Sequence, residues 1–254
     1  MALSMTKLSN KSIAAVEKQI KKYYASAMKH TIEDFESTYN KLLATIEAEQ
    51  QPTPADLYKL DKYWQAQAQM RQELQKLGDK QISAMSKIFE LNFFDIYYSI
   101  NIEGAKAFNT IDKSMVQQII NAVWVADGKS WSERIWENTS KLAETLNERL
   151  IDCVVTGKKP TQLKRELQER FGVSYSPADS LARTEIAHIQ TQAAEQRYKD
   201  YGIQMVEFYA DPDERTCPEC GKLHGKRTPV DNPQWHIPLH PRCRCCLLPV
   251  IDNE

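Results

Sequence analysis

The residues most able to do chemistry gather near the end of the chain. Five of the six cysteines and three of the five histidines lie between residues 217 and 246. They include two runs of the form ligand-Pro-x-ligand: Cys217-Pro218-Glu219-Cys220, here called the first knuckle, and His240-Pro241-Arg242-Cys243, the second knuckle. Thiolates and imidazoles at this spacing are the ligands of tetrahedral Zn²⁺ sites. We therefore predict a structural zinc ion on Cys217, Cys220, His240 and Cys243.

Turn geometry favours the same interpretation. Proline fixes φ near the value of a tight turn, so both ligands of a knuckle can point the same way. Gly221 is expected to take positive φ and to direct backbone N–H groups at the sulfurs. Cys245, one strand step beyond Cys243, remains an alternative fourth ligand. The other nearby candidates are expected to be loop or packing residues: His224, His236 and Cys246, with Cys153 packing on a helix.

Other chemistries fit these residues less well. A disulfide cluster would suit a secreted chain, but residues 1–5 show no apolar secretory segment. A catalytic zinc ion needs an open coordination position, whereas four ligands are already present. The zinc deaminase signature His-x-Glu is absent, because His188 is followed by Ile189 and Gln190. A closed, structural site is therefore predicted.

Composition sets broad limits. The 254 residues carry 33 Lys and Arg against 34 Asp and Glu, for a formal net charge of −1. This balance gives no global attraction for nucleic acid or membranes, and the excess around the knuckles is only about +1 with zinc bound. No run approaches the roughly twenty apolar residues that span a bilayer. The length suits one large domain or two small ones.

The elements that would position the site are mainly helices. Apolar residues at steps of three and four predict a helix from Ile13 to Ile46, with Tyr24 and Phe35 on its stripe. Thr53 and Pro54 mark the start of a second helix, whose predicted stripe is Leu57, Leu60, Trp64, Ala68 and Leu74 and which Gly78 is expected to end. A third helix follows from Ile82 to Ile96. Residues 1–100 are thus a predicted helical arm or bundle.

Further signals divide the second half. A linker is expected over 101–110 around Gly104, followed by a helix that a Ser130–Glu133 capping box opens and Gly157 ends. Pro160 should open a short helix closed by Gly172. Ser176 and Pro177 should start another, reaching about Tyr201 with Gly202 behind it.

Strands are expected only at the end, over 205–210 and from Cys245 to Val250, where side chains alternate. The predicted fold is mainly α: long N-terminal helices, then a helical domain over 125–254 that ends in a small zinc-stapled α+β (β-hairpin) module, residues 203–250. Such a module is too small to be stable without the metal.

Several ordered motifs resemble one known family. These are Leu181-Ala182-Arg183-Thr184-Glu185, Asp213-Glu214-Arg215-Thr216 before the first knuckle, Leu223-His224-Gly225-Lys226, and Pro238-Leu239 before the second knuckle. Over roughly residues 130–250 the chain is similar to the tailed-phage head morphogenesis family, the Mu F-like or SPP1 gp7-like minor head proteins. Some members continue into toxin or enzyme domains, and none is expected in these residues.

The resemblance implies a minor capsid protein, not an enzyme. Such a protein binds the portal protein at the portal vertex during procapsid assembly and can accompany DNA packaging or ejection. The scaffold and major capsid proteins are further candidate partners, and non-specific DNA contact is an option. The implied location is the virion, in the phage head near the portal, after assembly in the host cytoplasm.

An enzymatic role is one interpretation of Arg183, Thr184 and Glu185, because an arginine with a nearby acid could serve acid–base chemistry. On a helix, however, residues i and i+2 do not face each other, so Arg183 and Glu185 are poorly placed to act on one atom. We expect each of the three to tie its helix to the zinc module or to a neighbour. Glu185 and His188 are expected to form a surface hydrogen bond, and Asp213, Glu214 and Arg215 to shape the turn before the first knuckle.

One alternative function comes from a different class, a zinc-ribbon protein that binds nucleic acid. It would need a basic surface with stacking aromatic side chains near the metal. Only Trp235 and the small charge excess support it. Affinity for DNA at about 50 mM salt would favour it over a purely structural role.

Overall fold

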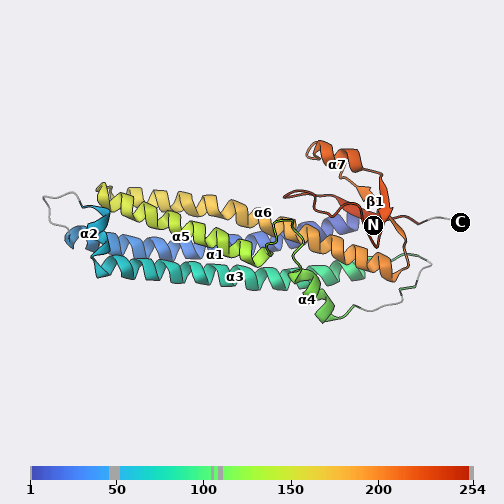
Figure 1. The fold of residues 1–254 in the computed structure, drawn as a ribbon, viewed down its shortest axis with the longest axis horizontal. Helices are drawn as coiled ribbons and strands as arrows, with labels where there is room; N and C mark the ends of the chain where they lie inside the picture. The colour runs from blue at the N-terminus through green and yellow to red at the C-terminus, as the bar shows by residue number, and fades with distance from the viewer. Residues whose placement is uncertain (1, 46–51, 104–105, 108–110, 252–254) are drawn as a thin grey trace. The chain divides into compact units, whose positions relative to one another are not determined.

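The computed structural model describes residues 2–45, 52–103, 106–107 and 111–251, without the side chains of 2–9, 42–43 and 45. The helices and strands, in chain order, are α1 (Ala2–Thr45), α2 (Pro54–Tyr58), α3 (Asp61–Ser99), α4 (Lys113–Asn121), α5 (Trp131–Val155), α6 (Pro160–Asp200), β1 (Met205–Tyr209), α7 (Pro218–Leu223), β2 (Arg227–Pro229) and β3 (Cys246–Pro249) (Figure 1). The chain is mainly helical, with one small antiparallel sheet near its C-terminus, as predicted. Across the described ranges, no helix is long and apolar enough to cross a membrane.

The chain forms two compact units. The first combines Met1–Glu17, Ala84–Trp131 and Ser180–Glu254, and the second combines Lys18–Ser83 and Ser132–Asp179. Helices α1, α3 and α6 contribute to both units, so compactness in space does not follow sequence order. The predicted sequence domains, 1–100 and 125–254, stay a prediction.

In the second unit, α1 supplies the apolar stripe that the sequence predicts. Ile20, Tyr24 and Phe35 are buried, and Ile46 lies outside the described residues. The buried tyrosines of this helix also donate hydrogen bonds to carbonyl oxygens of other helices. The Tyr24 hydroxyl donates to the Ser174 carbonyl at 3.2 Å, and the Tyr39 hydroxyl donates to the Cys153 carbonyl at 3.2 Å. These bonds fix α1 against α6 and α5.

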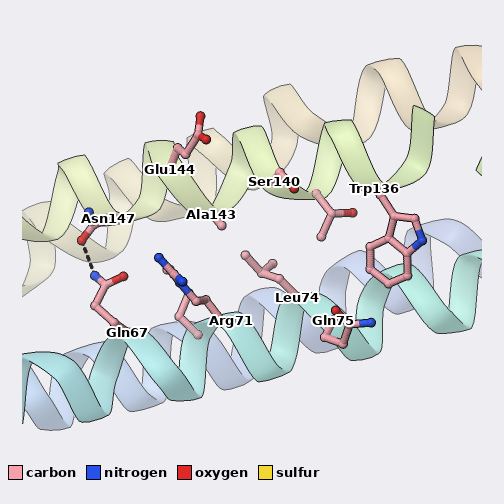
Figure 2. Close-up of a pocket in the computed structure, with 11 residues that line it drawn as sticks. Gln67, Arg71, Leu74, Gln75, Trp136, Ser140, Ala143, Glu144 and Asn147 are labelled. Carbon is pink, nitrogen blue, oxygen red and sulfur yellow. Dashed lines mark hydrogen bonds between the residues drawn. The ribbon is translucent and has the colours of Figure 1, made fainter. Parts of the chain in front are cut away.

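Helix α3 is one continuous helix, so the prediction that Gly78 ends it is wrong. A Cβ atom at Gly78 would lie 2.3 Å from the Trp136 ring, and glycine therefore serves close approach of α5 here. Figure 2 shows Trp136 projecting from α5 toward α3. The predicted stripe was also wrong at Trp64, which is 53% exposed, and at exposed Ala68. Leu57 and Leu74 are buried as predicted, and the other buried side chains of this stretch are Tyr63, Ala66, Met70 and Leu77.

Helix α6 is also continuous, and the predicted break between Gly172 and Pro177 does not occur. Proline lacks an N–H group and disturbs the helical hydrogen bonds of the preceding turn. In this turn the Ser174 carbonyl accepts hydrogen bonds from two other helices, from the Tyr24 hydroxyl and from Asn138 Nδ2 at 3.0 Å. The helix continues through Pro177, and the neighbouring Ser174 carbonyl is held by donors from α1 and α5.

Several predicted helix ends are confirmed. Thr53 and Asp56 form a capping box at α2, with the Thr53 N–H donating to the Asp56 carboxylate at 3.1 Å. Gly157 and Gly202 take positive φ, 64° and 72°, just beyond α5 and α6. The predicted linker centre, Gly104, lies outside the described residues.

The sheet belongs to the first unit and has the order β2-β1-β3. Val206 and Phe208 of β1 are buried and alternate with partly exposed neighbours, which confirms the predicted strand. The predicted second strand is β3, which pairs antiparallel with β1. The Tyr198 hydroxyl of α6 donates to the Leu247 carbonyl of β3 at 3.1 Å. This bond joins the sheet to the helix on which the Arg-Thr-Glu motif lies.

Candidate metal centre

The first knuckle lies at the N-terminus of α7. Cys217 is the N-cap and Pro218 the first helical residue, where a missing N–H group costs nothing. The Cys220 N–H donates to the Cys217 sulfur at 3.4 Å, so the backbone bond to sulfur comes from Cys220. The prediction for Gly221 is wrong, because this residue lies within α7 and does not take positive φ.

The second knuckle is a tight turn. The Cys243 N–H donates to the His240 carbonyl at 3.1 Å, with Pro241 and Arg242 between them. Arg242 has φ of 61°, the left-handed value that the third residue of a type II turn requires. His240 Nδ1 lies 3.0 Å from the Pro241 carbonyl. Donation of this N–H fixes the tautomer and leaves Nε2 as the ligand atom.

The two knuckles bring their ligand atoms together. His240 Nε2 lies 3.4 Å from the sulfurs of both Cys217 and Cys220, and the Cys220 sulfur lies 3.9 Å from that of Cys243. A tetrahedral site with metal–sulfur bonds of about 2.3 Å has sulfur–sulfur separations of about 3.8 Å. The arrangement can therefore hold a metal ion.

The ligand atoms fall into two groups that share Cys220. One group is Cys217, Cys220 and His240, and the other is Cys220, Cys243 and Cys245, each within 4.8 Å. Hydrogen bonding from Cys245 lowers the pKa of Cys243 to about 5, and the same contact with Cys243 raises the pKa of Cys245. A lowered pKa favours the thiolate form, which is the form that binds metals.

The other candidate ligands stand apart from these groups. His224 Nδ1 accepts a hydrogen bond from the Ala210 N–H at 3.2 Å, which holds the loop after α7. His236 is exposed. Burial raises the pKa of Cys246 to about 12 and that of Cys153 to about 11, so both thiols stay protonated. These positions agree with the predicted loop and packing roles.

A charged cluster joins the turn before the first knuckle to the residue after the second. The Asp213 carboxylate accepts from Arg215 Nη2 at 2.9 Å and from Arg244 Nη1 at 2.7 Å. Arg244 Nη1 also donates to Asp211 at 3.0 Å. The Arg244 hydrogen bond is the largest cause that holds the pKa of Asp213 well below its usual range. Asp213 and Arg215 thus shape this turn, as predicted.

Arg183, Thr184 and Glu185 each contact a different neighbour, as their spacing predicts. Arg183 pairs with Glu17 of α1. The Thr184 hydroxyl accepts from the Arg242 N–H at 3.1 Å. The Glu185 carboxylate accepts from Trp124 Nε1 at 3.0 Å. The motif therefore ties α6 to α1, to the second knuckle and to the segment after α4.

The predicted surface bond between Glu185 and His188 is wrong, because both side chains are buried. The His188 ring stacks on Trp124, with 4.2 Å between ring centroids, and burial lowers the pKa of His188 to about 4. The sequence did not predict Trp124 as a partner of Glu185 and His188, because Trp124 lies in a segment without apolar periodicity.

The fold and this site define a class of protein: a helical protein whose last long helix carries a small three-stranded module with a cysteine–histidine centre. Residues 144–248 match the family described as phage Mu protein F-like. This match supports the resemblance that the motifs predict, and the matched family is one of phage head morphogenesis proteins.

One curated relative is an NAD(+)–arginine ADP-ribosyltransferase, EFV, from Enterococcus faecalis (strain ATCC 700802 / V583). It is 26% identical over 187 residues, which cover 66% of this chain but only 38% of that protein. The chain therefore spans well under half the length of this relative. No solved structure matches the chain.

Proposed function

We propose that this chain is a minor head protein of a tailed bacteriophage that binds the portal vertex during procapsid assembly. The observation that carries the proposal is the Mu F-like match over residues 144–248, which includes the Arg-Thr-Glu motif and both knuckles. In this proposal residues 125–254 are the head morphogenesis domain and residues 1–100 a helical arm. The protein is assembled in the host cytoplasm, stays near the portal and can accompany the DNA.

We further propose that the centre holds a structural zinc ion on Cys217, Cys220, His240 and Cys243, with Cys245 as the alternative fourth ligand. The His240 Nε2 atom lies 3.4 Å from each of the Cys217 and Cys220 sulfurs, which supports this, because soft sulfur and nitrogen ligands select zinc among the common divalent ions. Cys243 completes the second knuckle together with His240, which favours it over Cys245. Four protein ligands close the site, so the ion would bind protein and not substrate.

The zinc ion would stabilise the C-terminal module, residues 203–250. Its sheet has three strands of three to five residues, and so small a sheet has little core of its own. The ADP-ribosyltransferase activity of the relative is not proposed for this chain, because the alignment leaves most of that protein uncovered.

Co-purification tests the proposed function. The full chain is co-expressed with the portal, scaffold and major capsid proteins of the same phage, the mixture is separated by size-exclusion chromatography, and zinc is measured across the peaks. We expect a stable complex that contains zinc. Portal binding would be contradicted if the folded, zinc-loaded chain elutes apart from the portal protein. This would have to hold for both the unassembled and the procapsid fractions. Elution with the scaffold or major capsid protein instead would replace the portal as partner.

A further inference from the structure

A cavity of about 560 Å³ lies in the first unit between α6 and the second knuckle. Four arginines line it: Arg183, Arg215, Arg242 and Arg244. They come from three separate segments of the chain, so the fold, and not local sequence, gathers these charges. The sequence alone shows only a small local excess of positive charge around the knuckles, because Arg183 lies 59 positions before Arg242.

Guanidinium groups outnumber carboxylates by one among the described residues at the cavity. Asp211 is the acidic residue among those that line it. Glu17 and Asp213 also contact these arginines, Glu17 through Arg183 and Asp213 through Arg215 and Arg244. Three carboxylates thus face four guanidinium groups. Burial and then the positive charge of Arg242 lower the pKa of Arg183, which places two like charges close together.

A buried donor also borders the cavity. Gln190 of α6 is 9% exposed, and within the described part of the chain its Nε2 has no hydrogen-bond acceptor. Burying an amide donor without an acceptor is unfavourable, because the group loses its hydrogen bonds to water. Such a group in a native structure points to a missing partner, such as water or a ligand. Gln190 is also among the residues that line the cavity.

We propose that this cavity binds a phosphate group, with Arg183 and Arg242 as the principal contacts and Gln190 as a neutral donor. Guanidinium groups present planar pairs of N–H donors that match the oxygens of phosphate. The volume exceeds that of one inorganic phosphate and lies in the usual range for small-ligand sites. It therefore fits a phosphate that carries a further group, as in a nucleotide or a DNA backbone.

The test uses the full, zinc-loaded chain and isothermal titration with inorganic phosphate at about 50 mM salt, where charged contacts are least screened. We expect one phosphate per chain. Arg242→Gln should weaken binding by about tenfold or more, as expected for loss of a charge-assisted hydrogen bond. Arg227→Gln is the matched control: it removes the same charge from exposed β2, away from the cavity, and should change affinity less than about twofold.

Gln190→Leu provides a second variant, which keeps the net charge and needs no arginine to be removed. Weaker phosphate binding by this variant supports a defined site. No binding by the unaltered chain up to about 10 mM phosphate overturns the proposal. Equal losses for Arg227→Gln and Arg242→Gln also overturn it, because they would show only diffuse surface charge. Thermal melting and zinc content show whether each variant is folded.

A competition experiment identifies the source of the phosphate group. A fluorescent single-stranded oligothymidylate is bound first, and inorganic phosphate or a mononucleotide is then added at constant ionic strength. Release of the oligonucleotide, absent for Arg242→Gln, supports a DNA backbone in the cavity. Phosphate binding without release supports a free nucleotide or phosphate at the same site.

Discussion

The Arg242 N–H donates a hydrogen bond to the Thr184 hydroxyl at 3.1 Å, and that hydroxyl in turn donates to the Ser180 carbonyl at 2.7 Å. The second knuckle is thereby fixed to α6 through one side chain. Because Thr184 lies in the Arg-Thr-Glu motif, the motif and the candidate metal centre form one physical assembly.

Replacing Thr184 tests this link. Thr184→Val keeps the shape but leaves the Arg242 N–H without this acceptor, so we expect a loss of about 1 kcal/mol in the free energy of unfolding. Thr184→Ser retains the hydroxyl and should lose much less. Urea denaturation at fixed zinc concentration measures both. Equal stability of the valine and serine variants would show that the bond contributes nothing.

Gly78 and Gly172 provide a matched pair of helical glycines. Gly78→Ala places a Cβ atom 2.3 Å from the Trp136 ring, so overpacking should destabilise the chain by about 1–3 kcal/mol. No atom lies within 4 Å of a Cβ at Gly172, so Gly172→Ala should stabilise α6 by about 0.5–1 kcal/mol. Thermal melting of both variants checks the opposite signs. A neutral Gly78→Ala would mean that Trp136 moves without cost.

The fourth metal ligand can be identified by comparing two serine variants. Cys243→Ser should lower zinc content well below one ion per chain, whereas Cys245→Ser should retain it, because Cys243 shares the second knuckle with the ligand His240. Elemental analysis of protein never exposed to chelators gives the result. The reverse order would assign the fourth position to Cys245.

Removing the metal should affect the chain unevenly. Chelation, or Cys217→Ser, should unfold residues 203–250, because binding of a structural zinc ion contributes directly to folding free energy. The second unit holds none of the proposed ligands and should keep its helices. Hydrogen exchange resolved by peptide measures both regions. Unchanged protection of residues 203–250 without metal would contradict a structural role.

Glu195 is expected to make the stability of the folded chain depend on pH. Burial raises the pKa of Glu195 to about 7, with smaller opposing effects of Lys199 and Gln192. The unfolded chain ionises this group near its ordinary value of 4.5, so stability falls as pH rises from about 4.5 through 7. Glu195→Gln removes this loss. The stability gap between variant and unaltered chain should therefore be larger at pH 8 than at pH 5.5.

Local sequence patterns predicted much of this fold. The knuckle spacing located the candidate centre, and helix caps such as Thr53 were correct because they depend on a few neighbouring residues. The errors arose where distant contacts override local preference. Gly78 and Pro177 look like helix ends until Trp136 and Tyr24 from other helices are placed beside them. The arginine cavity likewise depends on three segments that only the fold brings together.

Arg242 occupies a backbone conformation that glycine adopts freely and that costs other L-residues about 1 kcal/mol. A turn selected for ease of folding alone would place glycine there, between two metal ligands. Retaining arginine sacrifices some local stability in exchange for a guanidinium group at a fixed position. The proposed zinc ligands His240 and Cys243 thus flank the proposed phosphate contact within one four-residue turn, so a change at either site is expected to disturb the other.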